Sequence, residues 1–291
     1  MGHRIAVAAC EEVPDLDDDW PLLRAALTAR GVVATSQIWT DPSVDWASYE
    51  LVVVRGTWDY YYSAGRLQRF WEWVRRVESG TRLVNPASVI EWNTDKRYLV
   101  DLEAAGVAVV ATSWVPPGQP WQVPADEFVV KPAVSAGGYE TARYGPSEGE
   151  AAERHVRRLH EAGSVVMVQP YVSSVDDEGE TALIYLGGRF SHAINKASLL
   201  RAGAGVDDRL WARERITATQ PSDAQLRVAE AALAASEART DATSYARVDL
   251  LSMPGAGPAV SEIELVEPGL FLRFYPDTAP DRFAEVLAEL L

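Results

Sequence analysis

An alternation of short apolar strands and amphipathic helices fills the first 84 residues, and it constrains the fold more than any other feature of the chain. The sequence predicts strands at 4–9, 32–39, 51–54 and 82–84, with helices at 20–30 and 66–77. Strands that are joined through helices run parallel, because each crossover returns the chain to the same end of the sheet. The first third is therefore predicted to be a parallel α/β sheet covered by helices.

The pattern changes after residue 93, where short strands follow one another through tight turns. A helix is predicted at 94–105 with Asn93 or Thr94 as its cap, followed by a proline-rich loop at 114–124 and, later, a long mobile loop at 200–215. Further strands are predicted at 128–130, 139–144, 165–169, 182–186, 190–194, 245–251 and 259–266, with helices at 150–161, 222–237 and 282–291. This part is expected to be α+β with antiparallel hairpins.

The charged residues limit the partners that the chain can bind. The formal net charge is −15, and such a surface repels nucleic acids and anionic lipids. Only three lysines are present, Lys96, Lys131 and Lys196. A lysine ammonium is a compact charge suited to phosphate oxygens, so all three are candidate phosphate ligands. The single cysteine, Cys10, fits a reducing cytoplasm. The sequence contains no uncharged apolar stretch of about 18 residues, so no membrane span is predicted.

The last two predicted strands carry the sharpest candidate site. Residues two apart share a face of a strand, so Arg247 and Asp249 point one way from the first, as do Glu262 and Glu264 from the second. A solvated polar face is the alternative, but like charges on paired strands repel each other. A Mg²⁺ ion prefers such carboxylate oxygens and would resolve the repulsion. Because Arg247 offsets only part of it, Glu262→Gln is expected to leave the cation-free protein as stable as before or slightly more stable.

A glycine-rich hairpin at 128–141 is the second candidate site. Lys131 lies on its first strand, and Ser135, Gly137 and Gly138 lie in the turn. The motif is neither a Walker A loop nor a dinucleotide fingerprint, because no Gly-Lys-Ser/Thr follows and it joins two strands. Glycines let backbone N–H groups approach an anion closely. Such a turn is most often only a turn, but beside one of three lysines it predicts a phosphate site.

A third candidate begins where a buried strand ends at Pro170. Proline cannot donate to a ladder, so the backbone beyond Pro170 is predicted to be freed to meet a planar base, with Gln169, Pro170, Tyr171 and Val172 as the candidate contacts. Glu180 follows a short polar loop and is placed to accept hydrogen bonds from sugar hydroxyls. Taken alone, these residues fit an ordinary strand end better.

The N-terminal sheet offers a substrate side. In open parallel sheets, ligands bind beyond the carboxyl ends of the strands. Glu11 follows the first strand, and Arg55, Thr57 and Asp59 follow the third, so these four are the predicted substrate ligands. Arg55 is the candidate partner of a substrate carboxylate, and a plain surface arginine explains it equally well.

Taken in order, these segments resemble the ATP-grasp superfamily, which includes glutathione synthetase and D-alanine–D-alanine ligase, over nearly the whole chain. Residues 245–249 and 262–264, followed by Pro268-Gly-Leu-Phe271, are similar to the family's metal-binding strands and the turn after them. Within the superfamily, Asp95-Lys-Arg-Tyr-Leu99 and Arg55-Gly-Thr-Trp-Asp-Tyr60 resemble the actinobacterial ligases that close D-cycloserine from an O-ureido-serine precursor.

The resemblance implies roles for the hairpin residues. Asp249, Glu262 and Glu264 would hold Mg²⁺, with Mn²⁺ as an alternative, and Arg247 would steady the acyl intermediate. Relatives often carry asparagine where Glu264 stands, which puts the number of metal ions in question.

The resemblance also implies a nucleotide site. Lys96 and Lys131 match the two lysines that bind nucleotide phosphates, and residues 135–141 match the lid over the β- and γ-phosphates. Residues 169–172 match the adenine hinge and Glu180 the ribose contact. Lys196 sits where relatives often carry an arginine near the γ-phosphate. Three domains follow: 1–92 on the substrate side, 93–168 with the lid, and 169–291 with the metal strands.

The implied reaction consumes ATP and converts the carboxylate of a small amino-acid-like substrate into an acyl phosphate, which a nitrogen attacks. The nitrogen can belong to the same molecule, as in D-cycloserine-type ring closure in antibiotic biosynthesis, or to a second one. A small-molecule kinase on the same scaffold and a non-catalytic nucleotide sensor are the alternatives. The sequence leaves open whether the chain forms a homodimer, and neither nucleic acid nor membrane is expected as a partner.

Overall fold

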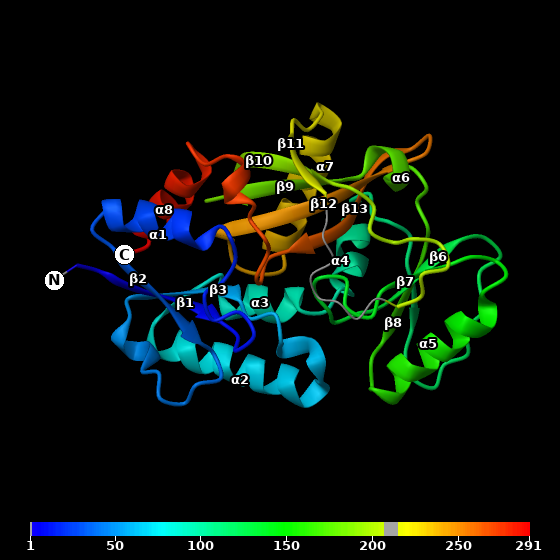
Figure 1. Ribbon diagram of the computed structural model, residues 1–291, viewed down its shortest axis with the longest axis horizontal. Coiled ribbons are helices and arrows are strands. Elements are labelled where there is room, and N and C mark those ends of the chain that lie inside the picture. Colours follow the sequence, from blue (N-terminus) through cyan, green and yellow to red (C-terminus); the bar gives the residue numbers. More distant parts are fainter. Residues whose placement is uncertain (1, 207–214) are drawn as a thin grey trace.

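The N-terminal third forms a parallel sheet, as predicted. The computed structural model describes residues 2–206 and 215–291 (Figure 1). The first sheet has the order β2-β1-β3-β4, and all its strands are parallel. Its strands are β1 (Arg4–Ala9), β2 (Val33–Ile38), β3 (Leu51–Gly56) and β4 (Arg82–Val84).

Helices cover both faces of this sheet because alternate residues of β1 point to opposite sides. Ile5 and Val7 pack in one core with residues of α1 (Trp20–Ala29). Ala6 and Ala8 pack in another core with residues of α2 (Ala64–Gly80). The last helix, α8 (Ala279–Glu289), packs against α1, so the C-terminal end of the chain returns to the N-terminal sheet (Figure 1).

The second sheet is antiparallel and has the order β11-β10-β9-β12-β13. Its strands are β9 (Glu180–Leu186), β10 (Arg189–Lys196), β11 (Ile216–Thr219), β12 (Tyr245–Met253) and β13 (Gly257–Glu264). The helix α7 (Asp223–Glu237) starts at a capping box made by Ser222 and Gln225 and covers one face. Strand β11 follows the predicted loop at 200–215 directly and lies in residues to which the sequence assigned no element. The predicted mobile loop at 200–215 lies partly outside the described residues, from 207 to 214.

The third sheet has the order β5-β8-β6-β7, and α5 (Gly149–Glu161) packs on it. Its strands are β5 (Ser113–Val115), β6 (Phe128–Pro132), β7 (Ala142–Tyr144) and β8 (Val166–Pro170). Strand β5 replaces the start of the loop predicted at 114–124. The short helices are α6 (Val175–Glu178), η1 (Trp46–Ser48), η2 (Tyr60–Tyr62) and η3 (Leu272–Phe274). Within the described ranges, no helix is both long and apolar enough to cross a membrane.

The predicted start of the helix at 94–105 is wrong. The structure has two helices here, α3 (Ala87–Asn93) and α4 (Tyr98–Ala104). Asn93 is not a cap: its side-chain amide donates to Ile263 O at 2.8 Å and accepts from Leu265 N at 2.7 Å, and so satisfies the outer edge of β13. The break between the helices lets the backbone N–H of Lys96 donate to Ala133 O at 2.8 Å. A long-range contact therefore ends the helix that local propensity favours.

The N-terminal sheet and the β12–β13 hairpin share one core. The Tyr245 hydroxyl lies 2.7 Å from Val54 O and 2.8 Å from Val266 O. Asn85 donates to the carbonyl oxygens of Tyr245 and Leu265, at 2.9 and 2.8 Å. These buried polar contacts fix the hairpin against the carboxyl ends of the parallel strands.

Candidate active site

The β12–β13 hairpin places its charged residues on one face, as predicted. In the register, Asp249 lies opposite Glu262, and Arg247 lies opposite Glu264. The intervening apolar residues pack in the core beneath α7: Val248, Leu250, Ile263 and Leu265. A β-bulge leaves Ser261 as an extra residue, which keeps both Glu262 and Val260 on their proper faces; the Ser261 hydroxyl lies 3.0 Å from Asp249 O.

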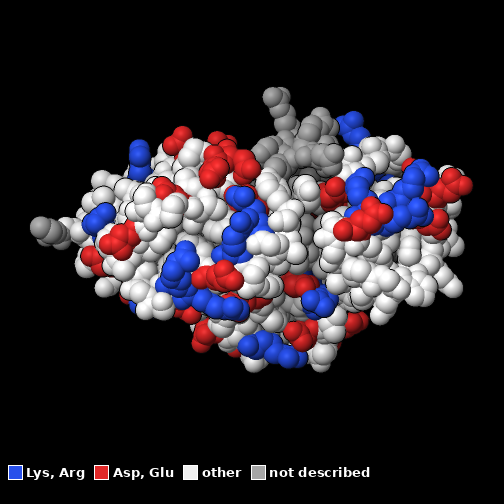
Figure 2. Space-filling model, turned by 90° about the horizontal axis from the view of Figure 1, so that it is seen from below, with Lys and Arg blue, Asp and Glu red and all other residues white. Residues whose placement is uncertain are grey.

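All three lysines of the chain meet these carboxylates. Lys131 Nζ on β6 lies 2.7 Å from Glu262 Oε1, and Lys96 Nζ lies 4.0 Å from Glu262 Oε2. Lys196 Nζ at the end of β10 lies 2.7 Å from Asp249 Oδ2. The scarce lysines are thus gathered at the site, where Lys96 is 6% and Lys196 8% exposed. On the face seen in Figure 2, basic and acidic side chains lie interspersed in small groups.

Arg247 completes the cluster from within β12. Its Nε and Nη2 donate to the two oxygens of Asp249 at 2.8 and 2.9 Å, and Nη2 also donates to Glu264. Its Nη1 donates to Gly269 O at 3.2 Å, in the turn after β13. The guanidinium therefore lies between the two carboxylates and the turn, held by four hydrogen bonds to described residues.

The surrounding charges control the ionisation of the three carboxylates. Burial opposes ionisation of Asp249, but Arg247 and Lys196 outweigh it and hold its pKa at about 2. Burial likewise opposes ionisation of Glu262, and the charges of Lys131 and Lys96 hold its pKa at about 2. Burial and the negative charges of Asp249 and Glu262 raise the pKa of Glu264 to about 7, because the attraction of Arg247 does not compensate for these two effects.

These contacts correct one premise of the sequence analysis. The carboxylates were expected to repel one another with only Arg247 as partial compensation, so that Glu262→Gln would not harm the cation-free protein. In the structure, Lys131 and Lys96 compensate Glu262 directly. Removing the charge of Glu262 would leave those ammonium groups without this partner and is therefore expected to destabilise the fold.

The glycine-rich turn folds over Lys96. The Lys96 ammonium donates to the Ser135 carbonyl oxygen and lies 3.3 Å from the Ser135 hydroxyl. Gly137 and Gly138 have φ values of 58° and 72°, a conformation that glycine adopts without strain. In the same loop, the ring of Tyr139 lies 5.3 Å from that of Tyr61, which belongs to the N-terminal domain. The predicted lid therefore contacts both Lys96, a predicted phosphate ligand, and the N-terminal domain.

The predicted adenine hinge differs in one detail. Pro170 pairs with Phe128, and the Tyr171 N–H still donates to Glu127 O at 2.8 Å, so the ladder continues past the proline and the predicted freeing of the backbone at Pro170 is wrong. Gln169 is buried and its side chain donates to Thr112 Oγ1 at 2.9 Å. The first residue beyond the ladder is Val172, which is 6% exposed. The contact of 169–172 with a base stays a prediction.

Glu180, the predicted ribose contact, lies beside the metal-site residues. Its Oε2 lies 2.6 Å from Lys196 Nζ, and its Oε1 accepts from the Ser261 hydroxyl. Lys196 thus bridges Glu180 and Asp249, which places the predicted ribose and metal residues within one ionic network. Its contact with ribose stays a prediction as well.

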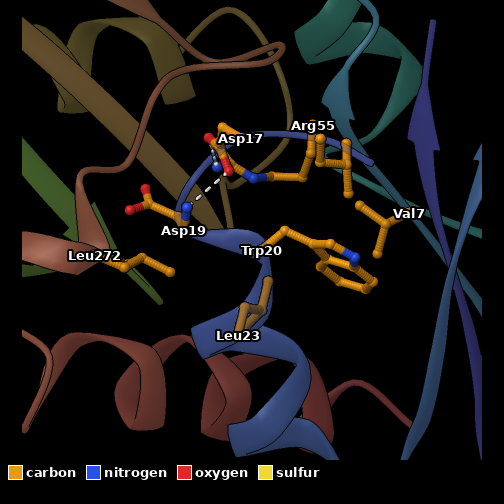
Figure 3. A pocket seen from close by; sticks show the side chains of 8 residues that line it. Val7, Asp17, Asp19, Trp20, Leu23, Arg55 and Leu272 are labelled. Atoms are coloured by element: carbon orange, nitrogen blue, oxygen red, sulfur yellow. Dashed lines mark hydrogen bonds and ion pairs between the residues drawn. The ribbon is translucent and has the colours of Figure 1, made fainter. Parts of the chain in front are cut away.

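Arg55 is not a surface residue. It is 4% exposed, and its Nη2 lies 3.1 Å from Asp17 Oδ2 (Figure 3). Its Nη1 donates to Pro268 O. It therefore ties β3 to the turn after β13. Binding a substrate carboxylate would require Arg55 to leave these partners.

The other three predicted substrate ligands lie in different surroundings. Thr57 and Asp59 are fully buried, and Asp59 Oδ1 accepts from Trp39 Nε1 at 2.7 Å. Glu11 is exposed and accepts from Thr40 Oγ1 at 3.3 Å. Asp59 is thus committed to internal contacts, and of the three only Glu11 is open to solvent.

A cavity at the junction of the three sheets contains residues that the sequence did not single out. Its lining includes Tyr60, Glu264 and Glu267, and the full set adds Asn93, Thr94, Lys96, Tyr98, Ser135, Ala136, Glu262, Ile263 and Val266. Glu267 lies three residues after Glu264, just ahead of Pro268-Gly269. Its only sequence signal is a third acidic residue directly before that turn.

The donor set of the hairpin fits a hard divalent cation. Mg²⁺ prefers oxygen ligands and is usually held by one or two carboxylates together with substrate phosphates. Asp249, Glu262 and Glu264 supply such oxygens from two paired strands, and lysines stand beside them. A nucleotide phosphate could thus meet the lysines and the metal at the same place.

Three sheets in this arrangement, with a carboxylate hairpin facing Lys131 of the sheet that carries the glycine-rich turn, are the fold of the ATP-grasp ligases. A family model for the N-terminal domain of D-cycloserine synthetase DcsG matches residues 5–85. The chain is 40% identical to the cycloserine biosynthesis protein DcsG of Streptomyces lavendulae, over 100% of this chain and 99% of that protein. The chain belongs to the DcsG family.

Solved structures agree with the fold. The crystal structure of D-cycloserine synthetase DcsG superposes with a TM-score of 0.88 at 37% identity, and the match covers 99% of this chain and 100% of that one. D-alanine–D-alanine ligase from Bacillus anthracis, complexed with ATP, gives a TM-score of 0.65 at 14% identity, over 99% and 97% of the two chains. The predicted ATP-grasp fold with an N-terminal parallel domain is confirmed.

Proposed function

We propose that this protein is an ATP- and Mg²⁺-dependent carbon–nitrogen ligase that closes D-cycloserine from O-ureido-serine, in a cytoplasmic pathway of antibiotic biosynthesis. Its membership of the DcsG family supports the pathway and the reaction class. The observation that carries the chemistry is the gathering of all three lysines and Arg247 on the carboxylate face of one hairpin. Such a set can exchange internal partners for phosphate and metal with little change in total charge.

Each residue of the cluster then has a task. Lys131 and Lys96 bind nucleotide phosphate oxygens, and Lys196 neutralises charge near the γ-phosphate. Asp249, Glu262 and Glu264 would hold Mg²⁺, which when bound neutralises charge on the transferring phosphoryl group. The glycine-rich loop closes over the phosphates and excludes water.

The reaction has three steps. A carboxylate oxygen of the substrate attacks the γ-phosphorus of ATP, the bond to the β-phosphate oxygen breaks, and ADP leaves. The substrate nitrogen next to the side-chain oxygen attacks the resulting acyl phosphate at its carbonyl carbon and loses its proton, and inorganic phosphate departs. Water then removes the carbamoyl group from that nitrogen as CO₂ and ammonia, which leaves D-cycloserine. The Arg247 guanidinium, held between two carboxylates and the Gly269 carbonyl, stabilises the negative charge that develops on the carbonyl oxygen.

Hydroxylamine trapping tests this proposal against a small-molecule kinase on the same scaffold. With ATP, Mg²⁺ and O-ureido-D-serine, the protein is expected to release ADP, and added hydroxylamine should yield a hydroxamate, which only an activated acyl group can form. ADP release with a stable phosphorylated product and no hydroxamate would assign a kinase. If the protein binds ATP but releases no ADP with any small amino acid as the substrate, it is a nucleotide sensor. Mass spectrometry detects the product. Formation of D-cycloserine in the absence of a second amine identifies intramolecular ring closure.

A further inference from the structure

The cavity where the lid, the N-terminal domain and the hairpin meet has an uneven charge lining. Its one cationic side chain is Lys96, while three glutamates face it, Glu262, Glu264 and Glu267. Glu262 is paired with Lys131, and Glu264 with Arg247. Glu267 has no such partner: no lysine, arginine or histidine nitrogen in the described parts of the chain lies within 4.0 Å of its carboxylate oxygens.

Glu267 is also one of the most buried acidic residues, at 6% exposure. Burial, together with the charge of Glu264, raises the pKa of Glu267 to about 8, although the Tyr60 hydroxyl, which lines the same cavity, lowers it. The charges of Lys96 and Arg247 act on Glu267 from beyond ion-pair distance and do not compensate for its burial, so a positive charge brought by a ligand would relieve that cost.

The N-terminal domain fixes the backbone that carries this carboxylate. The Glu267 carbonyl oxygen accepts from Trp58 Nε1 at 3.1 Å, and the Pro268 carbonyl oxygen accepts from Arg55. Arg55 is the residue before the last of β3 and Trp58 lies two residues beyond the strand, so this segment is held by the N-terminal domain while the Glu267 side chain lines the cavity. The buried position of Arg55 thus has a consequence for the site, although Arg55 itself does not face the cavity.

The lining indicates what kind of cation fits. Ala136, Val266 and the ring of Tyr98 give the cavity apolar walls beside the Tyr60 hydroxyl. Mg²⁺ demands near-octahedral oxygen ligands and keeps several waters, which suits the paired strands of the hairpin better than this mixed surface. An organic ammonium group fits a carboxylate, a hydroxyl and apolar contacts together. Lys96, the proposed phosphate ligand, lines the same cavity, so a carboxylate of the same molecule would lie toward the phosphate site.

We infer that Glu267, together with the Tyr60 hydroxyl, binds a positively charged amino group of the substrate and thereby selects substrates with a free amine. This rests on the proposed function, since it names a specificity residue for that reaction. The enzyme would hold a small zwitterion with its amine at Glu267 and its carboxylate toward Lys96 and the phosphate site. Glu267 is then a binding residue whose loss raises KM more than it lowers kcat.

The test is a comparison of two compounds in two proteins. O-ureido-D-serine and its analogue with hydrogen in place of the α-amino group are assayed by ADP release with the parent and with Glu267→Gln. The parent should prefer the amino compound, and in Glu267→Gln that preference in kcat/KM should fall by about 10- to 100-fold, the range for a hydrogen bond to a charged group. The KM for ATP should stay unchanged. Glu285→Gln, an exposed glutamate on α8, is the matched control.

Each other outcome decides the question as well. An unchanged preference in Glu267→Gln overturns the inference, and so does a loss of Mg²⁺ affinity in place of amine selectivity, which would make Glu267 a metal residue. If Glu267→Gln melts at the assay temperature, Tyr60→Phe removes only the hydroxyl and keeps the ring stacked 4.6 Å from Phe70, and it should lower the preference partly. If the parent releases no ADP, the proposed function fails, and calorimetry of the two compounds still tests Glu267: equal affinities in the parent overturn the inference.

Discussion

The Lys131 ammonium lies 2.7 Å from a carboxylate oxygen of Glu262, although the two residues are 131 positions apart and belong to different sheets. This pair joins the lid-bearing sheet to the hairpin. It also gives each residue a partner in the absence of substrate. When ligands bind, a phosphate would replace Glu262 as the partner of Lys131, and a divalent cation would replace Lys131 as the partner of Glu262. The pair is therefore expected to matter for stability and for turnover at once.

Glu262→Gln should lose ATP turnover by orders of magnitude and should also be less stable without ligands. The variant leaves Lys131 and Lys96 without their carboxylate, and because Glu262 keeps 22% side-chain exposure the loss is expected to be about 1–2 kcal/mol, below the range for fully buried pairs. Urea unfolding without ATP and Mg²⁺ measures it, with Glu285→Gln as control. A variant at least as stable as the parent would restore the repulsion argument drawn from the sequence, and parental turnover would remove the metal assignment.

Lys131→Met should weaken ATP binding about 10- to 100-fold, because a lysine–phosphate hydrogen bond between charged groups contributes roughly 1.5–3 kcal/mol. Titration calorimetry with ATP and Mg²⁺ measures the affinity. Parental affinity in this variant would rule out the phosphate role of Lys131.

ATP with Mg²⁺ should raise the melting temperature more than ATP alone, because ligands that bind only the folded state stabilise it by mass action. The carboxylates of Asp249, Glu262 and Glu264 are the proposed basis for the added stabilisation. Differential scanning calorimetry at fixed ATP with and without Mg²⁺ measures it. Identical melting temperatures would contradict a metal site on the hairpin.

Tyr139→Ala should loosen the lid. The ring of Tyr139 lies 5.3 Å from Tyr61 and 5.8 Å from Tyr62, and an aromatic pair contributes about 0.5–1.5 kcal/mol. Amide exchange in 135–141 should become faster in nucleotide-free Tyr139→Ala and stay near the parental rate in Tyr139→Phe, which keeps the ring. ATP should slow exchange of this loop in the parent. Equal exchange in all three proteins, with and without ATP, would argue against a lid.

His192→Gln should flatten the loss of stability in acid. His192 Nε2 lies 2.8 Å from Leu270 O, and burial lowers the pKa of the imidazole to about 4. Because the unfolded chain takes up this proton first, the contribution of neutral His192 is complete above pH 6.5 and is lost as pH falls toward 4. Between pH 7 and 4 the parent should lose about 2–3 kcal/mol more than the variant, which keeps an amide donor. Parallel pH profiles would assign the acid sensitivity elsewhere.

Local pattern determined much of this protein. Alternating strands and helices predicted the parallel sheet, and the two-residue period of a strand predicted that Asp249 and Glu262 share a face opposite Val248 and Ile263. Both inferences depend on neighbours in the chain, and a strand or helix keeps its period wherever it packs. The scarcity of lysine likewise marked the residues that gather at the site.

Only the tertiary structure decided what those side chains meet. Asn93 has the residue type of a helix cap, yet it satisfies the edge of β13, and Arg55 has the type of a surface residue, yet it is buried against Pro268. The pairing of Lys131 with Glu262 and the isolation of Glu267 depend on how three sheets pack together. Such contacts join residues far apart in the chain, and their strength depends on burial, which no local pattern of the sequence encodes.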